Sequence, residues 1–202
     1  MQLNAKFYTQ KDVVAIARQL LGKVLFTRID NKVCSGIITE TEAYAGLTDK
    51  ASHAFGDKRT RRTEVMYREG GCAYIYLIYG MHSLFNVVTN SKGIPEAVLI
   101  RSIFPLEGLK TIAFRKKGVV NRYKDGIGPG RLSKLLGLDY KMSGIPLQKT
   151  ENGDAVWIED QGKIIQGDKI IVGKRIGVDY AGEDAQRPYR FWIDKDMLEL
   201  IK

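Results

Sequence analysis

Two strand-like runs joined by turn-forming residues constrain the fold more than any other feature of the sequence. Residues 23–29 read KVLFTRI and residues 33–44 read VCSGIITETEAY, with Asp30-Asn31 between them. Asp and Asn favour turns, so these runs are predicted to be consecutive strands. Further strand-like runs, each bounded by Gly, Asn or Ser, occupy 73–79, 84–89 and 97–103. The pattern predicts a mixed or antiparallel sheet.

Helices are predicted at three other places. The first extends from a Thr9 cap to about residue 21, and the second covers 106–117. A short third helix, 131–136, follows the turn Gly128-Pro129-Gly130. The exposed amides of this turn could receive a phosphate, but the preferred interpretation is a turn that only separates two elements. Short strands are expected at 156–159, 169–172 and 189–193. No repeat or linker interrupts the chain, which predicts a single domain over residues 1–202.

Charge and composition limit the classes of function. Thirty-two Lys and Arg against 23 Asp and Glu give a formal net charge of +9, which favours nucleic acid or an anionic membrane as partner. No window approaches the roughly 20 apolar residues of a membrane span, and the amino terminus lacks the apolar core of a signal peptide, so a soluble, intracellular protein is expected. Cys34 and Cys72 lack metal-ligand spacing, which predicts buried free thiols and no metal site.

An acidic and aromatic segment, TETEAYAG at 39–46, stands out in this basic chain. In a strand, Glu40, Glu42 and Tyr44 would share one face because side chains alternate. Arg101 interrupts the apolar run EAVLIRSI, so it should be buried with a carboxylate partner or lie at the strand's end. Glu40 or Glu42 is the natural partner, and periodicity does not choose between them.

A basic loop and an apolar turn follow. Lys58, Arg59, Arg61 and Arg62 crowd five positions, a density suited to DNA phosphates, although most such runs are only solvated loops. Farther on, an exposed Tyr79 and Met81 would resemble the wedges that enter DNA between base steps.

Three polar or aromatic residues in the neighbouring strands admit two interpretations. Tyr74 and Tyr76 share a face and are first interpreted as core aromatics. Asn86, within LFNVV, needs hydrogen-bond partners in the protein or in a ligand. Taken together, a carboxylate, stacking aromatics, a cation, a wedge and a basic loop suit hydrolysis of the N-glycosidic bond of a base flipped out of a duplex.

Five motifs in one order strengthen this interpretation: ETEAYAG with His53 downstream, YIYLIYGMHSLFN, AVLIRSIFPLEG, GPGRLSKLLGL and RIGVDYAGEDAQRPYRFWI. They cover most of the chain between residues 37 and 193. In them the sequence resembles the mammalian-type alkyladenine (3-methyladenine) DNA glycosylase family, which also occurs in bacteria. The resemblance implies a monofunctional enzyme without cofactor or metal, acting as a monomer on double-stranded DNA with damaged purines at the bacterial chromosome.

The resemblance also implies a fold and a catalytic group. The fold would be a single α+β domain around a curved, mostly antiparallel sheet with flanking helices, resembling the carboxy-terminal domain of methionyl-tRNA formyltransferase. Glu42 would be the general base for water, and Arg101 and the main-chain carbonyl of Ile176 would help hold that water. Two departures are a His82 where mammalian members have Tyr, and the sequence of the basic loop.

The remaining implied roles concern the base and the duplex. Tyr44 and His53 would stack on one face of the flipped base and Tyr76 on the other, with the His53 amide contacting the base edge. Tyr79 would fill the hole left in the duplex, and Met81 would lean on the neighbouring pair. Asn86 would obstruct the exocyclic amino group of guanine.

Two other functions fit parts of the pattern. A non-enzymatic nucleic-acid-binding domain of similar fold would use the basic loop and the wedge, but not a carboxylate beside Arg101. A bifunctional glycosylase with lyase activity would need an amine nucleophile at the sugar, and no implied pocket residue is a lysine. Residue types do not determine which damaged purine is preferred.

Overall fold

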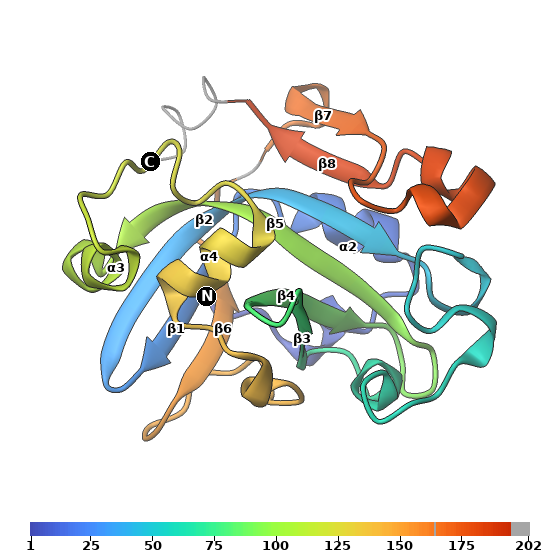
Figure 1. Ribbon diagram of the computed structural model, residues 1–202, viewed down its shortest axis with the longest axis horizontal. Coiled ribbons are helices and arrows are strands. Elements are labelled where there is room, and N and C mark those ends of the chain that lie inside the picture. The colour runs from blue at the N-terminus through green and yellow to red at the C-terminus, as the bar shows by residue number, and fades with distance from the viewer. Residues whose placement is uncertain (164, 195–202) are drawn as a thin grey trace.

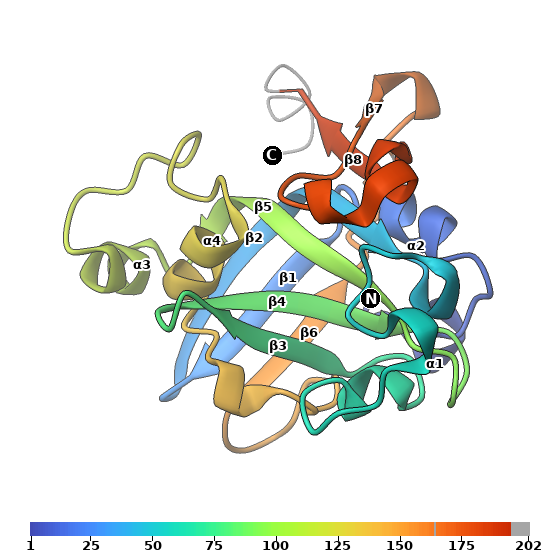
Figure 2. The ribbon, with the colours of Figure 1, turned by 45° about the vertical axis from the view of Figure 1, so that its right-hand side comes forward.

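One curled antiparallel sheet forms the centre of the protein, as seen in a computed structural model that describes residues 1–163 and 165–194 (Figures 1 and 2). Its strands are β1 (Val24–Ile29), β2 (Lys32–Tyr44), β3 (Ala73–Ile78), β4 (His82–Thr89), β5 (Glu96–Glu107), β6 (Ala155–Glu159), β7 (Ile170–Gly173) and β8 (Arg190–Ile193). Six follow the order β3-β4-β5-β2-β1-β6, while β8 pairs with β2 and β7. This confirms the predicted α+β fold with a curved, antiparallel sheet; the likeness to the formyltransferase domain stays a prediction.

Short helices flank the sheet. They are α1 (Ala5–Tyr8), α2 (Val13–Gln19), α3 (Leu109–Lys116) and α4 (Pro129–Leu136), with 3₁₀ turns η1 (Gly46–Thr48), η2 (Phe55–Asp57), η3 (Glu64–Tyr67), η4 (Tyr140–Met142), η5 (Gly167–Lys169) and η6 (Asp179–Gln186). Within the described residues, no helix is long and apolar enough to cross a membrane.

The Asp30-Asn31 turn joins β1 to β2. Asp30 and Asn31 have φ angles of 52° and 58°. Positive φ at both central residues is the signature of the tight hairpin turn whose twist matches paired strands. Ile29 consequently pairs with Lys32, and the register continues to Val24 opposite Ile37.

Three predicted helix starts are wrong, each by two or three residues, and α4 begins at Pro129 instead of residue 131. Thr9 ends α1 instead of opening the next helix, and the α2 cap is Asp12, whose carboxylate accepts from the amides of Val14 and Ala15. Asp ranks above Thr as an N-cap, and the observed cap is the better of the two residues. The second predicted helix begins at Leu109, not residue 106, because β5 continues to Glu107.

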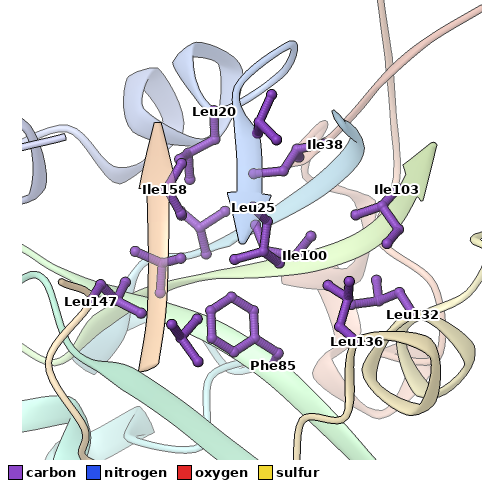
Figure 3. Close-up of a cluster of buried hydrophobic side chains, with 14 of the residues drawn as sticks. Leu20, Leu25, Ile38, Phe85, Ile100, Ile103, Leu132, Leu136, Leu147 and Ile158 are labelled. Atoms are coloured by element: carbon purple, nitrogen blue, oxygen red, sulfur yellow. The ribbon is translucent and has the colours of Figure 1, made fainter. Parts of the chain in front are cut away.

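The core lies between the sheet and the helices. Figure 3 shows Leu20 after α2, Leu132 and Leu136 of α4, and side chains from β1, β2, β4, β5 and β6 in one cluster. Phe85 and Ile100 in this cluster are fully buried. Cys34 and Cys72 are buried free thiols, as predicted.

The long strand β2 connects this core to a polar site. Its first half pairs with β1 and its second half with β8, while β5 lies along its other edge. The β2–β5 register shifts on both sides of Glu40, which marks irregular pairing at the change of partner. The acidic segment therefore begins where the sheet changes shape.

Candidate active site

Both glutamates of the acidic segment contact the same cation. Arg101 Nε lies 3.1 Å from Glu40 Oε1, and its Nη1 lies 3.3 Å from Glu42 Oε1. Arg101 is therefore the partly buried cation with carboxylate partners that the sequence predicted. Glu40 also meets Arg190 Nη1 at 3.0 Å and accepts from Ser102 Oγ at 2.7 Å, so two cations and a hydroxyl hold it.

Glu42 is the more deeply buried of the two, with no exposed surface. Its Oε1 also accepts from the Ile176 amide at 2.8 Å, and its Oε2 accepts from the Tyr44 hydroxyl at 2.9 Å. Burial raises the pKa of Glu42, whereas Arg101, the Ile176 amide and the Tyr44 hydroxyl lower it. The ionised form is thus stabilised by named partners against a strong desolvation penalty.

A cavity of about 510 Å³ opens in front of this carboxylate. It is lined by Tyr44, Ala51, His53, Arg62, Met66, Tyr74, Tyr76, Leu77, Ile78, Tyr79, His82, Leu84, Asn86, Ala97, Leu99, Arg101, Pro129, Gly130, Ile176, Gly177, Val178 and Tyr180. Glu42 is not itself one of these lining residues, but three of them, Tyr44, Arg101 and Ile176, contact its carboxylate. The volume is within the range of small-molecule sites.

The aromatic rings of the cavity group differently from the expectation. The His53 and Tyr76 rings are in edge-to-face contact, with centroids 4.7 Å apart. Tyr44 instead packs against Arg175, whose guanidinium carbon lies 4.9 Å from the ring centroid. The resemblance grouped His53 with Tyr44; the ring contacts group it with Tyr76. Tyr74 is buried, as the core interpretation predicted.

His53 is held as a neutral ring. Its Nδ1 lies 2.9 Å from the Tyr74 hydroxyl, and Arg62 Nη2 lies 3.0 Å from its Nε2. Arg62 Nη2 also lies 3.4 Å from Nδ1, so a guanidinium, which only donates, faces both ring nitrogens. Burial, followed by the charges of Arg62 and Lys58, lowers the pKa of His53 to about 4. The ring is thus uncharged at neutral pH.

The basic loop is exposed, but two of its four cations lie over aromatic rings. The Arg62 guanidinium carbon is 4.7 Å from the Tyr76 centroid, and that of Arg59 is 3.9 Å from the Tyr67 centroid. Arg62 therefore belongs to the rim of the cavity as well as to the loop.

The apolar turn between β3 and β4 projects from the protein. Tyr79 is 84% exposed and Met81 is 71% exposed. Tyr79 and Gly80 have φ of 53° and 68°, and the Met81 amide donates to the Ile78 carbonyl at 3.2 Å. Positive φ is unusual for a bulky residue and is a form of strain found at functional sites.

Asn86 lines the cavity from β4 and is buried. Its Nδ2 donates to the Tyr74 carbonyl at 3.0 Å and to the Leu84 carbonyl at 3.2 Å. Both N–H groups of the Asn86 side-chain amide thus donate to main-chain carbonyls. These two hydrogen bonds fix the side chain.

One feature near the site was not predicted. Asp49 and Arg175 form a fully buried ion pair behind Tyr44. The motif RIGVDYAG, which begins with Arg175, was part of the resemblance, but nothing in it indicated a partner 126 residues away.

Comparison with known proteins identifies the family. A family profile described as Methylpurine-DNA glycosylase matches residues 6–197. A Desulfitobacterium hafniense protein is 39% identical over 208 residues, which cover 100% of this chain and 99% of that protein. A Bdellovibrio bacteriovorus protein is 42% identical over 193 residues (96% and 95% covered), and a Bacillus thuringiensis protein is 41% identical over 202 (96% of each).

All three relatives are provisionally named 3-methyladenine DNA glycosylases. They match the chain nearly end to end, in agreement with the family profile. The chain therefore belongs to the methylpurine-DNA glycosylase family and is a base-excision DNA repair enzyme that hydrolyses N-glycosyl bonds.

Proposed function

We propose that the protein flips alkylated or deaminated purines out of double-stranded DNA and hydrolyses their N-glycosidic bond with a water activated by Glu42. The observation that carries this proposal is a fully buried carboxylate behind the floor of a cavity. Burial makes it a stronger base than an ordinary glutamate, and Arg101 keeps it ionised.

The contacts of Glu42 indicate where the water would bind. A carboxylate offers about four acceptor positions, two on each oxygen. Oε1 uses both, on the Ile176 amide and Arg101, whereas Oε2 accepts, among the described residues, from Tyr44 alone. Oε2 is thus the oxygen that takes the water. The Ile176 carbonyl would provide the second contact that the resemblance implies.

A flipped purine would bind in the cavity between two aromatic walls. Tyr44, His53 and Tyr76 all line the cavity, and the resemblance would place Tyr44 and His53 against one face of the base and Tyr76 against the other. A neutral His53 suits alkylated purines that carry positive charge, because an imidazolium would repel them. The His53 amide would contact the base edge, as the resemblance implies.

A lyase mechanism is the competing chemistry. It needs an amine nucleophile at the sugar, and no lysine is among the residues that line the cavity in the described part of the chain. Borohydride trapping on lesion DNA should therefore yield no covalent complex, while alkali should cleave the strand at the abasic product. Absence of alkali-labile sites would contradict glycosylase action; a trapped complex would show lyase chemistry.

The four cations of the basic loop, Lys58, Arg59, Arg61 and Arg62, are predicted to contact DNA phosphates. Neutralising one should weaken binding to all DNA sequences and lower the slope of log affinity against log salt by about one unit. Fluorescence anisotropy across a salt series measures this. Lys32→Ala is a matched control, because Lys32 is exposed at the opposite end of β2 from Glu42. An unchanged slope in the quadruple alanine variant would show that the loop does not contact DNA phosphates.

Asn86 is predicted to exclude undamaged guanine. Asn86→Ser shortens the side chain, so the exocyclic amino group should fit better and guanine excision should rise relative to hypoxanthine, by roughly tenfold. The loss of two main-chain hydrogen bonds should also destabilise the protein by about 1–3 kcal/mol. Excision from duplexes with guanine or hypoxanthine at one position gives the ratio, and an unaltered ratio would refute this role.

The cellular setting follows the same reasoning. The net charge of +9 and the bacterial relatives support action on the chromosome in the cytoplasm. A single cavity-bearing domain with its own wedge and base needs no second copy, so a monomer is proposed.

A further inference from the structure

We propose that the buried Asp49–Arg175 ion pair is a positioning element for excision, because it fixes both the Ile176 amide and Tyr44 against Glu42. This inference rests on the proposed role of Glu42 as general base. Arg175 is almost fully buried, and both of its terminal nitrogens donate to Asp49 or to main-chain carbonyls, so it acts through these groups and not on the substrate.

The ion pair has two parallel contacts. Arg175 Nη1 donates to Asp49 Oδ2, and Nη2 donates to Asp49 Oδ1 at 2.9 Å. Both side chains are fully buried. Two-point contacts of this kind fix orientation as well as distance.

The same two side chains hold the main chain on either side of Tyr44. Arg175 Nη1 donates to the Ala43 carbonyl at 2.9 Å, and Asp49 Oδ2 accepts from the Ala45 amide at 3.0 Å. The guanidinium also lies over the Tyr44 ring. The ion pair thus fixes the backbone, and packs against the ring, of the residue whose hydroxyl donates to Glu42 Oε2.

The second group held by the pair is the turn after β7. Ile176, which donates its amide to Glu42, is 51% exposed, and Gly177 adopts φ of +77°. An exposed side chain and a glycine provide little packing to fix an amide. Arg175 is the buried residue of this turn, and its Nη2 also donates to the Asp184 carbonyl in η6 at 3.0 Å.

Loss of the pair should alter the ionisation of Glu42. The carboxylate faces Arg101 of β5, Glu40 and Tyr44 of β2, Tyr76 of β3, and the turn that carries Arg175 and the Ile176 amide. The amide and the Tyr44 hydroxyl favour the charged form, so loosening them raises the pKa of Glu42. If the pKa of Glu42 is raised, the carboxylate becomes protonated at a higher pH as the pH falls. The acidic limb of the rate–pH profile therefore moves to higher pH.

The test is single-turnover excision of a lesion duplex with saturating enzyme, measured against pH. Asp49→Asn keeps the shape but weakens the pair, and should reduce the rate about tenfold and leave lesion binding intact. The double variant Asp49→Leu with Arg175→Met, which keeps the net charge near Glu42, should also move the acidic limb to higher pH. Arg175→Lys should restore part of the rate of an Arg175→Gln variant. Asp125→Asn, which breaks the Lys116 ion pair away from the cavity, is the matched control.

Removing one partner of a buried pair can unfold a protein, so circular dichroism is recorded at each pH. Asp49→Leu with Arg175→Met removes both charges together, so its acidic limb reports the loosened amide and hydroxyl, and its rate replaces that of Asp49→Asn if the single variant is not folded. A limb that stays in place in the folded double variant, or a rate loss that follows the unfolded fraction, would overturn the inference. Glu42→Gln is measured alongside: if it is active, the proposed general base fails, whereas an inactive Glu42→Gln with an unaltered Asp49→Asn refutes only the positioning role.

Discussion

Glu42→Gln is expected to abolish measurable excision, with a loss of at least roughly 10²-fold, while lesion DNA is still bound and the base still flipped. The amide keeps the size of the carboxylate; its oxygen can still accept from the Ile176 amide and its NH2 can donate to the Tyr44 hydroxyl oxygen, but it cannot take a proton from water. Single-turnover excision with saturating enzyme isolates this step from binding. A fluorescent base analogue at the lesion reports flipping in the same sample.

Glu40→Gln is the matched control, because it changes the neighbouring carboxylate on the same arginine. Glu40 contacts Arg101, Arg190 and Ser102, whereas Glu42 accepts hydrogen bonds from Tyr44 and Ile176, which line the cavity. Substantial activity should remain, with the main effect on stability. If Glu40→Gln were inactive and Glu42→Gln active, the assignment would be reversed; activity in both would reject a carboxylate base.

The sheet could be predicted from sequence because its signals are local. Alternation and the Asp30-Asn31 turn define β1 and β2 to within a residue. The first predicted helix begins too early because Thr9 is assigned as its cap, although Asp12 is the better capping residue and accepts from the amides of Val14 and Ala15. Local signals thus locate an element more reliably than its first residue.

The site was less predictable, because its decisive contacts join distant segments. Glu40 and Glu42 are equivalent by periodicity; Glu42 is distinguished in the structure by an amide 134 residues away, on Ile176. In the sequence, the family resemblance alone distinguishes Glu42 from Glu40. The position of Arg62 over Tyr76 likewise depends on how the basic loop folds, which its composition does not encode.

Tyr79→Ala is expected to weaken lesion binding and flipping by roughly 10- to 100-fold, because a wedge offsets an unstacking cost of a few kcal/mol. Stability should hardly change, since Tyr79 is 84% exposed and surface substitutions usually stay within about 0.5 kcal/mol. A buried aromatic would instead cost about 3–5 kcal/mol on truncation. Phe114→Ala is the matched control, because Phe114 is 78% exposed and lies outside the cavity.

Tyr79→Gly adds a sharper test of the strained turn. Tyr79 has φ of 53°, a conformation that costs an ordinary residue about 1–2 kcal/mol and a glycine little. The glycine variant should therefore be as stable as the natural protein, or more so, yet as poor at flipping as the alanine variant. Thermal unfolding and lesion-DNA titration measure the two effects. If the Tyr79→Gly variant flips the base normally, Tyr79 is not the wedge. The positive φ at this position would then serve only the geometry of the turn.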